Sequence, residues 1–212
     1  IECAADVCSV DGQGFSLFFP FVRSAVLSVD EGKKLVLTNI GLKDFQSDHV
    51  QLKSGAQLEF GNNVLVGVSR ELKLSSNIRI SGKVCIDCGG NKILFDDGFG
   101  FVFDDNGELE LRNGYVEDLS NRHNPFLLAA NSKLLLRDIA CTLNGDFTFG
   151  RGGLGIAGVC TLSTRKHSFN YVSASPLVIK NMSKLLFEQD SVFSVAVPIG
   201  SKALQFMGQN SC

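Results

Sequence analysis

The chain of 212 residues lacks the long apolar runs and the strong net charge that mark several common classes of protein. Its longest apolar candidate, residues 15–27, is interrupted by Pro20 and Arg23, so we expect no membrane insertion. The net charge is −2, and the densest basic cluster is only the run Arg165-Lys166-His167. We therefore expect no nucleic-acid partner, because nucleic-acid binding needs a basic surface.

Aromatic residues with polar atoms are also scarce. The chain has no Trp and 2 Tyr, against 17 Phe. A Phe side chain has no polar atom to satisfy, so it suits a column stacked inside a narrow interior. Hydrophobic residues make up 44% of the chain and charged residues 20%, which excludes a disordered chain.

The most informative feature that is present is a repeat. An apolar pair at positions i and i+2 returns after about 25 residues, which is typical of a solenoid whose coils stack on one another. The seven pairs are Leu35/Leu37, Leu58/Phe60, Val84/Ile86, Leu109/Leu111, Leu134/Leu136, Cys160/Leu162 and Leu185/Phe187. We interpret each pair as the buried face of a strand, because alternation with a period of two is the strand signal.

A second apolar pair precedes the first within each repeat, so each coil is expected to contain a strand, a short turn and another strand. Gly or Ser lies in these turns, as at Gly82 and Gly107, where glycine supplies a positive φ. Four residues after the first apolar position, a further column is expected to form the corner of each coil. Its members are Asn39, Asn62, Cys88, Asn113, Asp138, Thr164 and Gln189.

This pattern resembles the right-handed, single-stranded parallel β-helix of the pectin-lyase-like superfamily. The resemblance covers roughly residues 25–195 and rests on the coil length, the apolar pairs and the Asn-rich corner. It implies an all-β fold of about seven coils of about 25 residues. Left-handed β-helices have shorter coils, and leucine-rich repeats space the Asn one residue further from the Leu pair than Leu35, Leu37 and Asn39 do.

We expect one domain over residues 1–212. Residues 1–24, rich in Phe around Pro20, are expected to form an N-terminal cap or partial coil, residues 25–195 the repeat coils, and residues 196–212 a C-terminal partial coil or cap. The chain begins with Ile rather than Met, which suggests a processed or excised chain. An open end would be covered by a homo-oligomer or by a longer parent chain.

Seven cysteines leave at least one thiol unpaired. Cys3 and Cys8 are close enough for a small disulfide, which would fit an exported protein. Cys160 is expected to be buried. Cys85 and Cys88 form an isolated C-x-x-C with no second pair at zinc spacing, so we assign no metal or cofactor to them.

No catalytic motif is apparent, and we assign no catalytic residue. Enzymes with the resembled fold gather acidic side chains, and the nearest match here is a divergent acidic site around Asp96, Asp97 and Asp118. Turn chemistry also accounts for these residues. None of the three His residues lies beside a Ser or Cys in a triad-like pattern. Arg112 and Arg137 would stand on adjacent coils, either as an anion contact or, with Asp87, as a surface ion-pair ladder.

Val36, Leu135 and Leu186 are apolar at outward positions, which indicates a covering loop or a partner surface. The glycine-rich stretch 144–158 is a candidate for that loop. The sequence favours a non-catalytic secreted or cell-surface protein, an adhesin-like scaffold or binding module with a protein or glycan ligand. The alternative is a polysaccharide lyase or glycoside hydrolase with a divergent acidic site.

Overall fold

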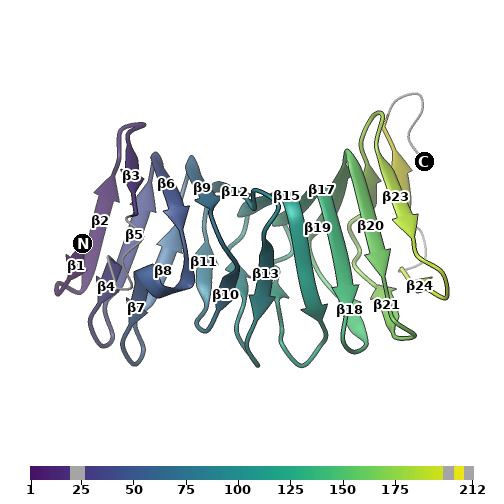
Figure 1. Cartoon of the computed structure of the whole chain (residues 1–212), viewed down its shortest axis with the longest axis horizontal. Helices are drawn as coiled ribbons and strands as arrows, with labels where there is room; N and C mark the ends of the chain where they lie inside the picture. Colours follow the sequence, from purple (N-terminus) through teal and green to yellow (C-terminus); the bar gives the residue numbers. More distant parts are fainter. Residues whose placement is uncertain (20–26, 198–202, 208–212) are drawn as a thin grey trace.

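The computed structural model describes residues 1–19, 27–197 and 203–207. These residues form an all-β parallel solenoid of about eight turns, with a single 3-10 helix, η1 (Ser47–His49). Figure 1 shows the coils stacked along one axis, with β1 at one end of the stack and β24 at the other. The all-β solenoid prediction is confirmed, while its right-handedness stays a prediction. The first coil was not recognised as a full coil from the sequence, because Cys8 and Val10 occupy the positions that are Leu35 and Leu37 in the next coil.

Each coil has three sides, and on each side the strands pair with those one coil away. We number the sides in the order in which the chain passes along them. The third side is an unbroken ladder of nine strands. Two of these, the long strands β15 and β17, continue round a corner onto the first side. The members of the third side are β3 (Ser16–Phe18), β6 (Ile40–Phe45), β9 (Val64–Val68), β12 (Lys83–Asp87), β15 (Glu108–Leu119), β17 (Lys133–Leu143), β19 (Gly153–Ala157), β22 (Leu177–Ile179) and β25 (Leu204–Phe206).

The other two sides are each interrupted once. The first side holds β1 (Glu2–Cys3), β4 (Leu27–Val29) and β7 (Val50–Leu52), then β10 (Leu72–Leu74), β13 (Lys92–Phe95), the second parts of β15 and β17, β20 (Val159–Ser163) and β23 (Lys184–Phe187). The second side holds β2 (Val7–Asp11), β5 (Lys34–Thr38), β8 (Gln57–Phe60), β11 (Ile78–Ile80), β14 (Phe101–Phe103) and β16 (Phe126–Leu127), then β18 (Phe147–Phe149), β21 (Ser168–Tyr171) and β24 (Val192–Val195).

The predicted apolar pairs are buried along most of the stack, but the exact 25-residue register is wrong at two coils. Leu35 pairs with Leu58 and Leu109 pairs with Leu134, as expected. Leu58, however, pairs with Ile78 on the second side rather than with Val84, which belongs to the third side. Likewise Leu134 pairs with Leu154 and not with Cys160.

Both errors have one cause. The coils from Leu58 to Ile78 and from Leu134 to Leu154 are 20 residues long, about five shorter than the repeat. About six residues after each true partner, another apolar pair begins the next side of the coil. The sequence interval from Leu58 to Val84, or from Leu134 to Cys160, is therefore 26 residues, but it joins positions on two different sides. The two interruptions of the first and second sides fall at these two short coils.

The corners also differ in detail from the prediction. Asn39, Asn113 and Asp138 have positive φ as expected, but in the second coil the left-handed residue is Asn63 rather than Asn62. After Cys88, Thr164 and Gln189 it is the following residue that turns, at Gly89, Arg165 and Asp190. The prediction of a positive φ is wrong at both Gly82 and Gly107. Gly107 is required for a different reason, because a Cβ there would lie 2.3 Å from the Ile80 carbonyl oxygen.

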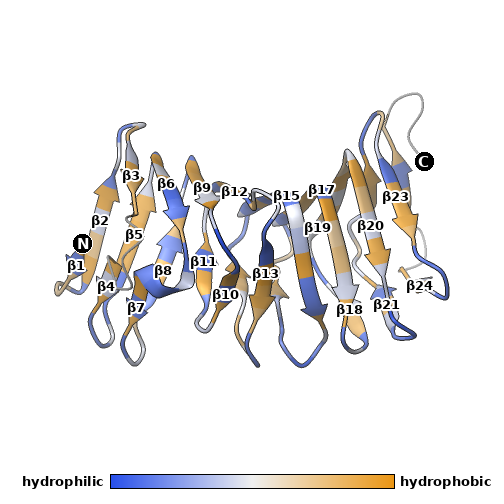
Figure 2. Cartoon of the chain, viewed as in Figure 1, coloured by the Kyte–Doolittle hydropathy of each residue, from blue (hydrophilic) through white to orange (hydrophobic). Residues whose placement is uncertain are grey.

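The glycine-rich stretch 144–158 does not cover a face, contrary to expectation. It forms β18 and β19, because alternate residues Phe147, Phe149, Leu154 and Ile156 are buried and stack on neighbouring coils. Figure 2 shows hydrophobic and hydrophilic segments following one another along the strands of the stack.

The two ends are built differently. Residues 1–19 form β1, β2 and β3, which pair with β4, β5 and β6 as a coil, and a disulfide joins Cys3 to Cys8 as predicted. At the other end β25 pairs with β22, and Leu204 and Phe206 are about half-exposed although they continue the inward columns. Pro20, Phe21, Ser201, Lys202 and Cys212 lie outside the described residues. In the described part of the chain, no helix has the length and apolar character to cross a membrane.

Candidate functional site

A groove of about 830 Å³ runs across the outer face of the third side, from β9 to β22. Where it crosses β19 the groove meets two glycines at outward positions, Gly153 and Gly155, and the next outward residue of the strand, Ala157, is also small. The paired positions on β17 carry Lys133, Leu135 and Arg137. A strand without large outward side chains next to one with three of them leaves a trench. The groove therefore follows from the glycines of β19.

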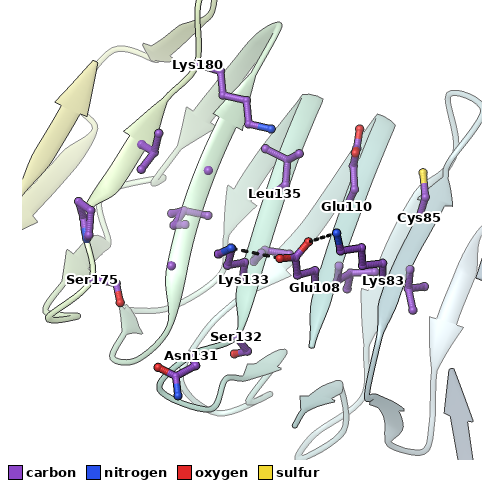
Figure 3. Close-up of a pocket in the computed structure, with 18 of the residues that line it drawn as sticks. Lys83, Cys85, Glu108, Glu110, Asn131, Ser132, Lys133, Leu135, Ser175 and Lys180 are labelled. Atoms are coloured by element: carbon purple, nitrogen blue, oxygen red, sulfur yellow. Dashed lines mark hydrogen bonds and ion pairs between the residues drawn. The ribbon is translucent and has the colours of Figure 1, made fainter. Parts of the chain in front are cut away.

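Charged residues form a row along one edge of the groove. The Glu108 carboxylate lies between two lysines, 3.1 Å from Lys133 Nζ and 4.0 Å from Lys83 Nζ (Figure 3). These three residues stand at equivalent positions on β12, β15 and β17. Each exposed pair contributes little to stability in water, and the two lysines with one glutamate leave this edge with a net charge of +1.

The middle row of the groove is largely apolar. It comprises Leu65, Cys85, Glu110, Leu135, Gly155 and Val178 on successive strands. Glu110 is the charged member, and its Oε1 lies 2.5 Å from Arg137 Nε. Burial raises the pKa of the Cys85 thiol above its ordinary value, so this group adds no charge near neutral pH. The groove thus offers apolar surface between paired charges.

Leu135 was predicted as an outward apolar residue, and the structure places it in this groove. Val36 and Leu186 are on the second and first sides, so the three residues form no common patch. The groove itself was not predicted from the sequence, because Gly153 and Gly155 were assigned to a loop.

The ion-pair interpretation of the two arginines is confirmed. Arg112 and Arg137 occupy paired positions on β15 and β17. Arg112 Nε lies 3.0 Å from Asp87 Oδ2, and Arg137 is held by Glu110. Both guanidinium groups therefore have carboxylate partners.

The structure does not bring together the three side chains of the predicted acidic site, Asp96, Asp97 and Asp118. Asp96 forms an ion pair with Lys73 at 2.8 Å, whereas Asp97 contacts Arg122 and His123. Asp118 lies at a corner with positive φ. Within residues 1–19, 27–197 and 203–207, no group of three or more His, Cys, Asp or Glu side chains is placed to hold a metal ion.

Cys85 and Cys88 point to opposite faces, because residues three positions apart in an extended segment lie on opposite sides. Cys85 faces the groove, while Cys88 is fully buried in the core, where burial raises the pKa of its thiol to about 12. Cys160 is buried as predicted. The C-x-x-C pair therefore presents no joint site to solvent.

One constellation contradicts the expectation from the sequence. His123 Nδ1 lies 3.0 Å from Ser120 Oγ, and its Nε2 lies 3.1 Å from Asp97 Oδ1. The spacing Ser120-x-x-His123 is the only sequence signal for it. Nδ1 also lies 2.8 Å from the Asp118 carbonyl oxygen, which requires a proton on Nδ1. In this arrangement His123 does not accept the proton of Ser120, and Ser120 is buried, so the cluster fastens a turn.

Comparisons of the chain with known protein families, with curated protein sequences and with solved structures gave no match. The candidate site is therefore judged on its own geometry.

Proposed function

We propose that this protein is a non-catalytic secreted or cell-surface binding scaffold that uses the groove of the third side to hold a glycan or protein ligand. The observation that carries the proposal is the composition of the groove: a central apolar row between charged residues that are paired with each other. Such a surface gains free energy when a ligand covers it and excludes water from its apolar area.

The secreted or surface location is part of the same proposal. It is supported by the Cys3–Cys8 disulfide, since structural disulfides persist in oxidising compartments. Adhesin-like character, right-handed coiling and a place in the pectin-lyase-like superfamily rest on the sequence pattern together with the parallel solenoid. They are supported at the level of fold only.

The test uses fluorescently labelled protein on a glycan array and on cultured cells before and after glycosidase treatment. Loss of cell binding after treatment identifies a glycan ligand, and retained binding identifies a protein ligand. Gly155→Phe places a large side chain in the groove and should abolish binding. The fold should tolerate it, because the atom nearest to an added Cβ is the end of the Leu135 side chain, at 2.9 Å. Thr161→Phe, at an outward position of β20 outside the groove, is the matched control.

The enzymatic alternative is assayed in parallel on pectate and alginate. Turnover of either polymer, lost in Asp97→Asn, would replace the binding proposal with the lyase or hydrolase. Absence of binding to both array and cells would contradict the scaffold.

A further inference from the structure

A second recess lies at the shorter coil between β17 and β19, on the second side of the solenoid. It has a volume of about 430 Å³ and lies between β16 and β18, the two strands at which the second side is interrupted. Its lining includes the buried residues Phe103 and Phe147 and the half-buried Phe126. The recess exists because the short coil places β18 out of pairing distance of β16.

The edge of β16 that faces the recess carries unpaired main-chain groups. The Phe101 amide donates to the Pro125 carbonyl, and Phe101 is paired with Phe126. In a parallel ladder, successive residues direct their N–H and C=O groups to opposite sides. The N–H and C=O of Phe126 and the N–H of Leu128 therefore point away from β14, and no described residue hydrogen bonds to them there.

The facing strand is satisfied instead by a side chain. The Thr148 amide donates to Asn121 Oδ1 at 2.8 Å, and the Asn121 amide donates to the Asp146 carbonyl. The other interruption, between β7 and β10, is also bridged, since the Lys73 amide donates to Ser47 Oγ of η1 at 2.7 Å. The β16 edge thus differs in combining open main-chain groups with an apolar recess.

A cation stands at the rim of this recess. Arg151 lines it and is exposed, and no described residue forms an ion pair with its guanidinium. Most other charged groups near the strands have partners one coil away, as in the pairs Arg79–Asp104 and Lys92–Glu117. Arg151 is therefore suited to a carboxylate supplied from outside the chain.

We propose that this recess is a second binding site, independent of the groove, which captures an extended segment of a partner protein as an added strand on β16. The segment pairs with the main chain of Phe126 and Leu128, directs alternate apolar side chains toward Phe103, Phe126 and Phe147, and places an acidic residue near Arg151. Main-chain pairing supplies affinity, while the apolar floor and the arginine supply specificity.

The test selects binders from a phage-displayed library of random heptapeptides. Enriched peptides should alternate apolar and polar residues and carry a carboxylate. Leu128→Pro, which removes an edge N–H, and Arg151→Gln should each weaken a selected peptide by about tenfold or more. Arg165→Gln, an exposed arginine on a distant turn, is the matched control and should leave the affinity unchanged.

Hydrogen exchange gives a readout that does not depend on the variants folding. In the free protein the amides of Phe126 and Leu128 should exchange faster than that of Phe101, and peptide binding should protect them. No enrichment, binding insensitive to both substitutions, or protection elsewhere would overturn the site. A dimer that is lost in Leu128→Pro would show that a second copy supplies the strand, and it too would overturn the proposal. Gly155→Phe should leave peptide binding intact, so this test fails or succeeds independently of the groove.

Discussion

Leu58 and Ile78 are stacked neighbours on the second side, although only 20 residues separate them in the chain. Both are almost fully buried, at 0% and 4% exposure. A coil of this length cannot follow the same perimeter as its 25-residue neighbours, and it omits one ladder of strand pairing instead. In this solenoid the length of a coil therefore determines how many of its sides pair with the next coil. The other short coil, from Leu134 to Leu154, leaves the recess beside β16 in the same way.

The first prediction concerns the inward columns. Leu109→Asp places a carboxylate between Val84 and Leu134 and should lower the free energy of unfolding by on the order of 5 kcal/mol. Leu186→Asp, at an outward position that is 45% exposed, should cost less than about 1 kcal/mol. Urea titration followed by circular dichroism measures both. Equal stability of the two variants would refute the inward assignment of Leu109.

A second prediction tests the close approach at Gly107. Gly107→Ala should destabilise the protein by about 1–3 kcal/mol, because the new methyl group would meet the Ile80 carbonyl rather than a movable side chain. Gly150→Ala introduces the same group where no atom lies within 4 Å and should be tolerated. A melting temperature unchanged in Gly107→Ala would show that the coils are further apart at this turn.

Thiol reactivity should follow burial. In a Cys212→Ser background, Cys85 should react with iodoacetamide at pH 8, whereas Cys88, Cys141 and Cys160 should react only after unfolding. Burial raises the pKa values of all four thiols, to about 12 for Cys88, so the buried ones are both inaccessible and protonated. Peptide mapping by mass spectrometry identifies the labelled residue. Rapid labelling of Cys88 would contradict its place in the core.

Asp87 should contribute to the pH dependence of stability. Partial burial raises its pKa, but hydrogen bonds from Asn113 and the Gly89 amide and the charge of Arg112 outweigh this, so the pKa lies below the ordinary 3.8. A depressed carboxyl pKa stabilises the folded state above pH 3.8, and this contribution is lost as the pH falls through the folded pKa. The fall in melting temperature below about pH 4 should therefore be shallower in Asp87→Asn. Asp105→Asn, an exposed turn substitution, is the control, and identical profiles for all three proteins would contradict the assignment.

The sequence alone was sufficient to predict the parallel solenoid, the buried Leu pairs, the Cys3–Cys8 disulfide and the Arg112–Asp87 ion pair. Each of these depends on residues that are close in sequence or separated by one regular coil. The alternation of inward and outward positions is a local property of strands, so it survives any error in coil length.

The short coils and the groove were not predictable in the same way. All three sides carry the same i, i+2 apolar pattern, so Val84 on the third side could be mistaken for the successor of Leu58. Gly153 and Gly155 favour a loop by composition, but Leu154 and Ile156 are buried between neighbouring coils and hold the segment as a strand. The contact of His123 with Asp97 depends on the packing of one coil on the next, which no pattern within a single coil reveals.

The missing ladder between β16 and β18 also has a mechanical consequence. Adjacent coils are joined by three sets of strand pairs through most of the stack, but at this level only two remain, β15 with β17 on the first side and β17 with β19 on the third. Tension applied along the axis would be carried there by two sets of strand pairs instead of three. A pulled molecule would divide first at one of the two levels where a ladder is missing, here or between β7 and β10, and leave shorter stacks.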